Sequence, residues 1–592
     1  MFEFILGIFL VIVPFVLLGL FLDKKRGFVS ILFFLCLFFS VLFFLTQLSG
    51  IFTYWVVISL FALTDMAILY FYFFIKKKGL KIPKIDWILV VVVLIAVGNL
   101  YQVHYNYTGK INLAVDTEVG YHEVKNMKYV YPYFSDEWYA VSLIKETINS
   151  QSLAFKNPLD NSFFLNLQVF FHSFVAGIIL ILGLDPLTQY VLVSLAFNVL
   201  IIVLVYIFLR IRNVPKLVSA ISSLSILYIT CGANLPGIWN FIPVHMGIIF
   251  SLFGFCFLAL NSIFMVVLSL VLVFLFYPPI SIFLGMGFIV YLFEKFYKKD
   301  GKFLKIFSYS LIVSFVAIPL AYLILMVSPL AGFIEHLISR VFYSSFYGPN
   351  LTNINFYNII PLPIILFALF GMIFVFKNKK WFFSIFLLGL IFWIFYSFTT
   401  KRFLIEFERV VFITSIIIAI ISGFGIEQFK NYLNQKYKNI NYKVIKYVEV
   451  FVVLLFLLFI PFYTQRENWK TITLINIYNR AISYPKAPAN NYLTEEDLKI
   501  FENIKNKRFL SLGWKGTVIS TATDNYPIVA KEGTLSLGEE ITVREFLDAS
   551  CEIKKRIAEK RKIDYIYLHN FSCPGFKKID ESKEKLVLYE VS

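Results

Sequence analysis

The sequence predicts an all-α polytopic membrane protein of about 14 transmembrane helices, followed by a small extracytoplasmic α/β domain. Hydrophobic residues fill 59% of its 592 positions, and the mean hydropathy is +0.77. A soluble protein cannot bury that much apolar surface. The apolar residues form long unbroken runs, as membrane-spanning helices require, and not the alternating pattern of an outer-membrane barrel.

The net charge of +17 fits the same class of protein. Its Lys and Arg residues stand in short clusters between the apolar runs, where the cytoplasmic bias of positive charge in membrane proteins accounts for them. We therefore expect the lipid bilayer, and no nucleic acid, as a partner of this chain.

Three apolar runs form an N-terminal part, residues 1–86, ahead of the membrane core. They are residues 4–22, 29–48 and 54–75, and a fourth run at 87–103 opens the core. No basic segment precedes the first run, so it is predicted to be a span and not a cleaved signal peptide. The Lys-rich links at 23–26 and 76–84 are expected in the cytoplasm, which places the N-terminus outside.

The apolar run at 163–184 allows two interpretations. If it spans the membrane, the basic cluster at 210–216 lies outside. If it lies along the outer surface, the run at 187–209 spans inward and that cluster faces the cytoplasm. The run carries Asn166 and His172, which suit an interfacial helix better than lipid contact, so we adopt the surface placement.

The rest of the core (87–463) alternates between spans and short links. The predicted spans are residues 216–230, 244–260, 263–276, 280–296, 303–327, 358–376, 381–398, 410–426 and 445–463. Their boundaries are least defined between 244 and 276. The Lys-rich segments 295–305, 377–380 and 430–446 then face the cytoplasm. Both chain termini are extracytoplasmic in this arrangement, and the protein is expected in the cell membrane.

Residues 464–592 differ in composition and predict a small α/β domain. Strands are predicted at 509–512, 518–521, 565–568 and 586–589, and one helix at 543–562. Cys551 and Cys573 flank this helix and a strand, and a disulfide between them would persist outside the cell. Two free thiols are the alternative.

The most distinctive polar stretch lies in the first large outer loop, residues 104–187. Asp136 and Glu137 follow Ser135, a predicted helix N-cap, so both acids fall in a first helical turn. Apolar residues then recur at helical spacing, at Trp138, Val141, Ile144 and Ile148. Two interpretations follow: a catalytic acid pair at the membrane face, or acids that only offset the helix dipole.

Cations are expected on the same side of the membrane. Lys401, Arg402 and Arg409 stand in an outward link between two spans, and His336 and Arg340 stand in another outer loop. Outward cations run against the usual inside bias, although Lys and Arg also extend to interfaces without any other role. A carboxylate can act as the base for an attacking hydroxyl, and a guanidinium opposite it can bind a phosphate. This arrangement suits the transfer of a sugar whose leaving group is a lipid phosphate.

Several motifs resemble the membrane-embedded GT-C glycosyltransferases, which include protein O-mannosyltransferases, lipid A aminoarabinose transferases and oligosaccharyltransferase catalytic subunits. The matching features are an aromatic lead into Asp136 and Glu137, the amphipathic helix after them, Asn157-Pro158 and the surface apolar helix. The tail is similar over residues 508–523, Asp564-Tyr-Ile-Tyr-Leu568 and Leu588-Tyr-Glu-Val591. The resemblance covers most of the chain after Trp87.

This resemblance implies a polyprenyl- or dolichyl-phosphate sugar as donor and a reaction on the extracytoplasmic face. Asp136 would activate the acceptor, and Glu137 would orient it or help to hold a metal. The donor phosphate would be bound by Arg402, Arg409, Lys401 and Arg340. The link 231–245 lacks the second acid of several family members, which leaves a divalent metal cofactor open, with His245 and His336 as additional candidate residues. The sequence identifies neither the sugar nor the acceptor.

Two other functions stand as alternatives. A transporter or flippase for a lipid-linked sugar would place ionisable groups near mid-span, and Asp65 is nearly the only acid so placed. A non-catalytic membrane scaffold would tolerate changes to the acid pair.

Overall fold

The structure is a computed structural model of the chain. It describes residues 5–8, 27–70, 86–105, 107–112, 121–132, 135–164, 166, 168–229, 237–238, 240–297, 360, 362–399, 405–436, 493–531, 534–535, 543–582 and 585–591. The predicted spans 303–327 and 445–463, and nearly all of 4–22, lie outside the described residues.

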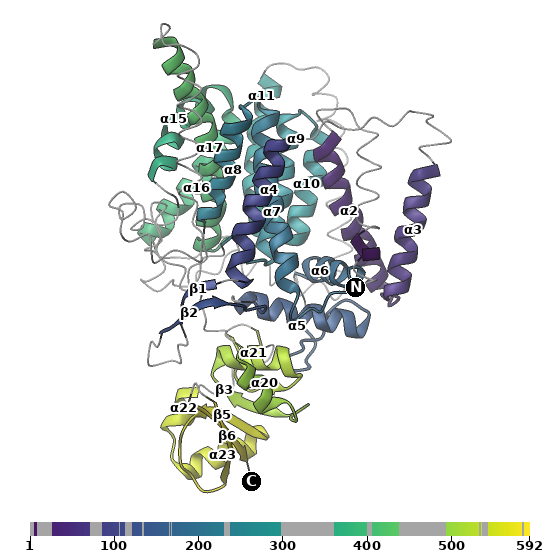
Figure 1. Cartoon of the computed structure of the whole chain (residues 1–592), viewed down its shortest axis with the longest axis vertical. Coiled ribbons are helices and arrows are strands. Elements are labelled where there is room, and N and C mark those ends of the chain that lie inside the picture. Colours follow the sequence, from purple (N-terminus) through teal and green to yellow (C-terminus); the bar gives the residue numbers. More distant parts are fainter. Residues whose placement is uncertain are drawn as a thin grey trace.

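Most of the described chain is a bundle of apolar helices, and the C-terminal domain lies beyond one end of it (Figure 1). Within the described residues, 6 segments are long and apolar enough to cross a membrane. They correspond to α2 (Gly27–Leu48), α4 (Trp87–Tyr105), α7 (Tyr190–Ile211), α11 (Ser281–Tyr297), α16 (Lys380–Thr399) and α17 (Phe407–Lys436). The chain is thus a helical membrane protein, and the total of about 14 spans stays a prediction.

Shorter apolar helices lie among these, and each begins within a few residues of its predicted start. They are α3 (Tyr54–Tyr70), α8 (Lys216–Leu224), α9 (Pro243–Ala259), α10 (Ile263–Phe276) and α15 (Leu362–Asn378), with the 3-10 turns η2 (Ser225–Tyr228) and η3 (Pro278–Ile280). The turn between α9 and α10 contains Asn261, whose φ of 57° is left-handed. Asn tolerates this backbone conformation better than most residues, which allows the chain to reverse within a short turn.

Phenylalanine rings fill the space between the helices. Phe33 of α2 makes edge-on contacts with Phe250, Phe253 and Phe257 of α9, with ring centroids 6.2, 5.5 and 5.2 Å away. Such pairs set the positive edge of one ring against the negative face of the other. They belong to an apolar cluster that reaches from α2 to α17.

Glycines allow a close approach of α15 and α17. A Cβ added at Gly371 would collide with the backbone of Ile421, and one added at Gly425 would collide with the backbone of Phe367. Small residues at helix crossings let backbones pack closely, which is a main source of helix association in membranes. The position of α17 therefore depends on α15.

The run predicted at 163–184 forms α6 (Val169–Ile181), which lies beside α5 (Ser135–Ser150) at the end of the bundle (Figure 1). Its 13 residues extend over about 20 Å, less than the ~30 Å of a bilayer core. Asn166 and His172, the polar residues that favoured the surface placement, are both buried. They bond each other, with Nδ2 of Asn166 3.1 Å from Nδ1 of His172.

Strands occur in two places. In the loop predicted to be extracytoplasmic, residues 104–187, β1 (Tyr107–Asn112) and β2 (Tyr121–Met127) form an antiparallel hairpin that the sequence analysis did not predict. In the C-terminal domain, the strand order is β4-β3-β5-β7-β6, with β4, β3 and β5 parallel and β7 antiparallel to both its neighbours.

Two helices of the C-terminal domain lie on the side that faces the helix bundle, and two lie farther from it (Figure 1). Its strands are β3 (Arg508–Ser511), β4 (Tyr526–Pro527), β5 (Tyr565–His569), β6 (Phe576–Glu581) and β7 (Leu586–Val591). Its helices are α20 (Glu495–Phe501), α21 (Gly513–Thr523), α22 (Val543–Asp548) and α23 (Cys551–Arg561). The predicted strands at 509–512, 565–568 and 586–589 are confirmed within one or two residues, and β4 and β6 were not predicted.

The predicted strand at 518–521 is wrong, because these residues belong to α21. Val518 and Thr521 are β-branched and favour strands by intrinsic preference. Their side chains instead contact α5, and Gly516 lets the helix lie against the backbone of Val529. Tertiary packing overrides the local preference here.

The single helix predicted at 543–562 is also wrong, because the chain breaks it into α22 and α23. Ser550 is the N-cap at which the second helix, α23, begins. Its hydroxyl accepts a hydrogen bond from the N–H of Ile553. Ser competes with helical bonding in this way, so it favours a helix start over a helix interior.

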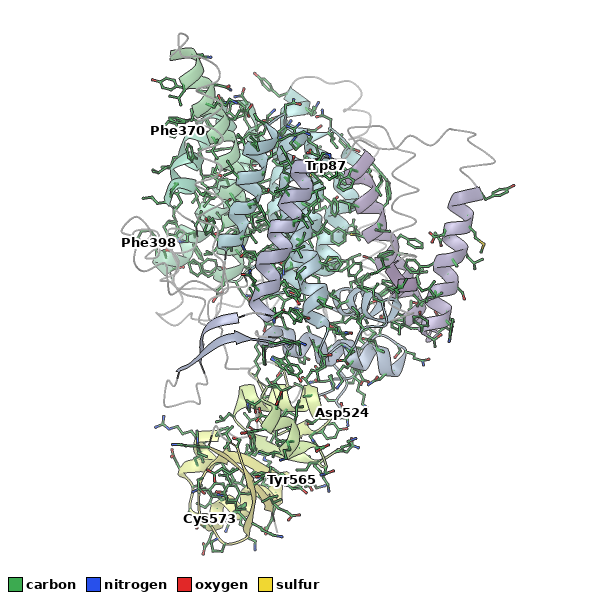
Figure 2. The ribbon with its side chains drawn as sticks, viewed as in Figure 1. Trp87, Phe370, Phe398, Asp524, Tyr565 and Cys573 are labelled. Atoms are coloured by element: carbon green, nitrogen blue, oxygen red, sulfur yellow. A yellow bond between two sulfur atoms is a disulfide. The ribbon has the colours of Figure 1, made fainter. Side chains whose placement is uncertain are left out.

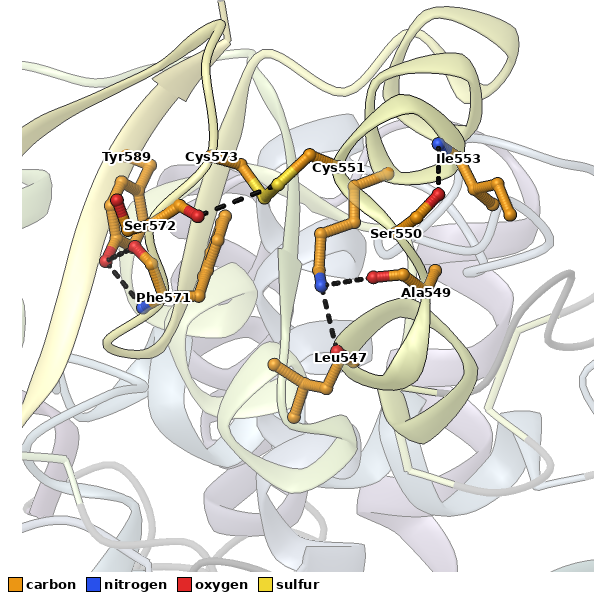
Figure 3. Close-up of a disulfide and its surroundings, with 10 residues drawn as sticks. Leu547, Ala549, Ser550, Cys551, Ile553, Phe571, Ser572, Cys573 and Tyr589 are labelled. Atoms are coloured by element: carbon orange, nitrogen blue, oxygen red, sulfur yellow. Dashed lines mark hydrogen bonds between the residues drawn. A yellow bond between two sulfur atoms is a disulfide. The ribbon is translucent and has the colours of Figure 1, made fainter.

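The predicted disulfide between Cys551 and Cys573 is present and joins the start of α23 to the loop after β5 (Figure 3). The Cα atoms are 5.4 Å apart. Lys554 reinforces the same corner, since its Nζ donates to the carbonyls of Leu547 and Ala549 at 2.9 and 2.6 Å. This corner lies far from the helix bundle.

Candidate functional site

The first turn of α5 carries both predicted acids, and the helix turns them toward different surroundings. Trp138, Val141 and Ile144 are fully buried, as predicted for the apolar side of this helix, but Ser142 and Leu143 are buried as well, so the burial extends around its middle. Glu137 shares the side of Val141 and Ile144 at positions i, i+4 and i+7, and it is only 3% exposed. Asp136 keeps 24% of its side-chain surface exposed.

Glu137 holds the segment that leads into α9. Its Oε1 accepts a hydrogen bond of 2.8 Å from the backbone N–H of Phe241, and the hydroxyl of Tyr190 donates to the carbonyl of the same residue. A carboxylate is a strong acceptor for a buried N–H. Glu137 therefore ties α5 to α9, which favours a positioning role for this acid.

Asp136 is the meeting point of three parts of the chain. Its Oδ2 lies 3.2 Å from Nη2 of Arg409, in the first turn of α17. Its Oδ1 pairs with the ammonium group of Lys531, which follows β4 in the C-terminal domain. The side chains of Arg409 and Lys531 are 12% and 22% exposed. A cation thus holds each carboxylate oxygen, while part of the Asp136 side chain stays exposed at the protein surface.

Arg409 is held by two further groups. Its Nε lies 3.2 Å from Oε2 of Glu406, three residues earlier, and Tyr277 hydrogen-bonds the same side chain. The planar guanidinium presents several donors at once, so these contacts determine its orientation. Within the described residues, Arg409 is the predicted cation that the fold brings to the acid pair.

The described charged side chains around Asp136 and Arg409 carry more negative than positive charge. The carboxylates are Asp136, Glu137, Glu406 and Glu408, and the cations are Arg409 and Lys531. A phosphate would need additional positive charge, because like charges at short range repel. The other predicted site residues lie outside the described part of the chain, namely Lys401, Arg402, Arg340 and His336.

His245 is near this site but does not face the carboxylate. It is fully buried in the first turn of α9. Its Nε2 lies 3.0 Å from the carbonyl of Gly237, and its Nδ1 lies 3.2 Å from the backbone of Ile242. Both ring nitrogens are thus used to hold the backbone before α9, and its ring packs against Phe412.

The described acids do not form a metal site. No three His, Cys, Asp or Glu side chains gather in the part of the chain that the structure describes. Both oxygens of Asp136 are in ion pairs, and an oxygen of Glu137 accepts from a backbone N–H. A divalent cation takes several oxygen ligands, and the described residues bring no three candidate ligands together.

Two tyrosines near the acid pair keep their protons at neutral pH. Burial, with the charges of Glu495 and Asp185, raises the pKa of Tyr131. Burial, with the charge of Asp160, raises the pKa of Tyr139 well above its ordinary value. Neither hydroxyl is therefore an anionic base at neutral pH.

The aromatic lead before the acid pair docks the C-terminal domain. The hydroxyl of Tyr129 accepts a hydrogen bond of 2.9 Å from the N–H of Leu493. The ring of Tyr131 stacks on Trp138 with the centroids 6.2 Å apart. Trp138, Leu493 and Val518 then form one buried apolar cluster between the helix bundle and the domain.

Polar contacts also fasten α21 to α5. Nζ of Lys145 donates to the carbonyl of Thr521 at 2.8 Å and pairs with Asp524 at 3.2 Å. The hydroxyl of Thr521 lies 3.4 Å from the carbonyl of Trp138. Figure 2 shows Asp524 at the end of the domain nearest the bundle and Cys573 at the far end.

The sequence analysis missed Lys531. This lysine belongs to the domain predicted at 464–592, whereas Asp136 belongs to the outer loop, and no motif surrounds it. Lys residues are frequent throughout the tail, so none of them stood out. Only the docking of α21 on α5 brings this cation to the carboxylate.

No protein-family model matches the chain, and no curated protein matches it. The chain is similar to solved structures of the oligosaccharyltransferase of the archaeon Archaeoglobus fulgidus. With the apo form, the TM-score is 0.46 at 13% identity, over 81% of this chain and 69% of that one. For a form tethered to an acceptor peptide containing the NVT sequon, the TM-score is 0.44 at 12% identity, over 81% of this chain and 68% of that one. For the complex with an inhibitory peptide and a dolichol-phosphate, the TM-score is 0.38 at 16% identity, over 81% of this chain and 68% of that one.

Proposed function

We propose that the protein is an integral membrane glycosyltransferase. It moves a sugar from a polyprenyl- or dolichyl-phosphate donor to a hydroxyl or amide of an acceptor on the extracytoplasmic face. The observation that carries this proposal is the accessible Asp136 carboxylate, held by Arg409 and Lys531 where the apolar bundle meets the polar domain. A lipid donor would keep its chain beside apolar helices and its phosphate at this boundary. The motifs that resemble GT-C glycosyltransferases support the same function.

Asp136 is the proposed general base. It takes the proton of the acceptor as the acceptor atom attacks the anomeric carbon of the sugar. The bond from that carbon to the phosphate oxygen breaks, and its electron pair leaves on the lipid phosphate. Arg409 and Lys531 favour the ionised carboxylate, because nearby positive charge stabilises it. A carboxylate has about four lone-pair positions, so two ion pairs leave room for the acceptor.

Arg409 is the described residue proposed to bind the donor phosphate. A guanidinium has five N–H donors in a planar fork, more than the pairs with Asp136 and Glu406 use. Because carboxylates outnumber cations among the described side chains, the remaining positive charge has to come from elsewhere. We propose the predicted cations for this task, namely Lys401, Arg402 and Arg340.

The test of this function is Asp136→Asn in the full-length protein, reconstituted in nanodiscs. The substitution keeps the size of the side chain and removes the base. With serine- and asparagine-containing peptides supplied as acceptors, we expect the release of polyprenyl phosphate from a panel of polyprenyl-phosphate hexoses to fall by about 100-fold or more, the usual contribution of a general base. The amount of folded protein in the membrane should not change.

Asp580→Asn is the matched control, because Asp580 is an exposed acid on β6, the edge strand at the opposite end of the sheet from β4. It should release lipid phosphate at the wild-type rate. Wild-type release by Asp136→Asn would show that Asp136 is not the base, and no release by the wild-type protein with any donor would contradict the proposed function.

One observation favours a second candidate, a transporter of lipid-linked sugar. Asp65 is buried in the apolar helix α3, and its Oδ1 has no hydrogen-bond partner among the described residues. Buried acids in membrane helices often belong to transport pathways. Movement of a fluorescent polyprenyl-phosphate sugar between leaflets of a vesicle, lost in Asp65→Asn and kept in Asp136→Asn, would support this candidate instead.

A further inference from the structure

Lys531 reaches Asp136 from a different domain, and its backbone is fixed on both sides. Its N–H donates to the hydroxyl of Thr517 on α21 at 2.9 Å. Its carbonyl accepts from the N–H and the hydroxyl of Thr534, at 3.1 and 2.6 Å. The place of this lysine therefore does not depend on its ion pair with Asp136.

A buried asparagine of the outer loop holds the same segment. Asn157 is fully buried, and its Nδ2 donates to the carbonyl of Thr534 at 2.8 Å. Its Oδ1 accepts from the N–H of Leu159 at 3.1 Å. Burial of an amide is unfavourable unless such bonds are made. Asn157 thus fixes the segment of Lys531 against the loop that carries Asp136.

Helix α21 connects the position of the domain to the position of this lysine. Val518 and Thr521 of α21 contact Trp138 of α5, next to the acid pair. Thr517, on the same helix, holds the backbone of Lys531. If α21 separates from α5, Lys531 moves with it and leaves Asp136.

We propose that Lys531 is a positioning residue for Asp136, so that the site is complete only when the C-terminal domain is docked on α5. This inference rests on the proposed function, in which Asp136 is the base. Arg409 holds one carboxylate oxygen and Lys531 holds the other. With a single partner the carboxylate is free to rotate about its side-chain torsions, whereas partners on both oxygens select one orientation.

The test uses the full-length protein in nanodiscs, with the same panel of polyprenyl-phosphate hexoses as donors. Lys531→Met removes the charge and keeps most of the stem, and Lys531→Arg restores a cation. We expect kcat for Lys531→Met to fall about 10- to 100-fold, as for a misplaced reacting group, with KM for the donor nearly unchanged. Lys531→Arg should recover part of this loss.

Lys145→Met is the matched control. It removes a lysine of the same interface that contacts Thr521 and Asp524 and not Asp136. Limited proteolysis of the C-terminal domain reports docking in both variants. The proposal is supported if Lys531→Met has a low kcat with normal docking and Lys145→Met does not have a low kcat. Parallel losses of docking and kcat in both variants, or an unchanged or raised kcat in Lys531→Met, would overturn it.

A double-mutant cycle tests the contact without any substrate. Thermal unfolding is measured for Lys531→Met, Asp136→Asn and the combined variant. Non-additive shifts in Tm support the contact, whereas additive shifts contradict it. If the wild-type protein releases no lipid phosphate, the proposed function fails, and the cycle still decides whether Lys531 positions Asp136.

Discussion

Asp136 and Glu137 are neighbours in the sequence, but a helix turns by about 100° between them. Glu137 consequently points into the protein and bonds the backbone of Phe241, while Asp136 stays at the accessible rim with two cations. This difference separates an acid that holds the structure from an acid that can meet a substrate. It also shows why an acid pair in a first turn need not act as one unit.

Glu137 offers a prediction at this scale. Glu137→Ala leaves the buried N–H of Phe241 without its partner, so the free energy of unfolding should fall by about 1–3 kcal/mol. Glu137→Gln keeps an oxygen acceptor, and its loss should be smaller. Denaturant unfolding of the purified variants measures both. Full loss of lipid-phosphate release in Glu137→Gln, with normal unfolding, would instead show that the charge of Glu137 is required.

At the scale of elements, the membrane helices begin close to where the sequence predicts them, because apolar length and flanking charge are local properties. The secondary structure of the C-terminal domain depends more on contacts between residues that are far apart in the sequence. Val518 and Thr521 favour a strand by propensity, yet contacts with α5 hold them in a helix. The short strand β4 (Tyr526–Pro527) depends on pairing with β3, which no local pattern indicates.

The crossing of α15 and α17 gives a prediction for an element. Gly425→Ala places a methyl group against the backbone of Phe367, so the two helices must separate. We expect a loss of about 1–3 kcal/mol in the free energy of unfolding, as for an overpacked core. Because α17 carries Arg409, lipid-phosphate release should fall as well. Thermal unfolding and the release assay measure the two effects.

Gly98→Ala on α4 is the control for that variant. Among the described residues, no atom outside the local helix backbone lies within 4 Å of a Cβ added at Gly98, so the same change there should be neutral or slightly stabilising. Equal losses of stability at Gly98 and Gly425 would show that the effect comes from helix propensity and not from the crossing.

At the scale of the whole molecule, the candidate site lies between parts that are far apart in the chain. Asp136 comes from the outer loop, Arg409 from α17 and Lys531 from the C-terminal domain. The apolar cluster of Trp138, Leu493 and Val518 holds the domain in the place that this arrangement requires. Activity should therefore depend on the domain interface as much as on the acids.

Val518→Asp tests this dependence. A carboxylate at a fully buried apolar position is strongly unfavourable, so the domain should separate from α5 while the helix bundle stays folded. We expect faster proteolysis of the C-terminal domain and at least about tenfold slower release of lipid phosphate. Ile553→Asp is the control, because Ile553 is 48% exposed on α23. Wild-type release by Val518→Asp with a separated domain would refute the dependence.

The sequence by itself determined the class of protein, most helix positions in the described chain and the place of both acids in one helical turn, and it offered the disulfide between Cys551 and Cys573 as one of two alternatives. These follow from composition, periodicity and compartment, which neighbouring residues reveal. Only the tertiary structure decided that Glu137 is buried, and that Arg409 and Lys531 meet at Asp136. Such contacts depend on how α17 and α21 pack, and residues hundreds of positions apart leave no local pattern of that packing.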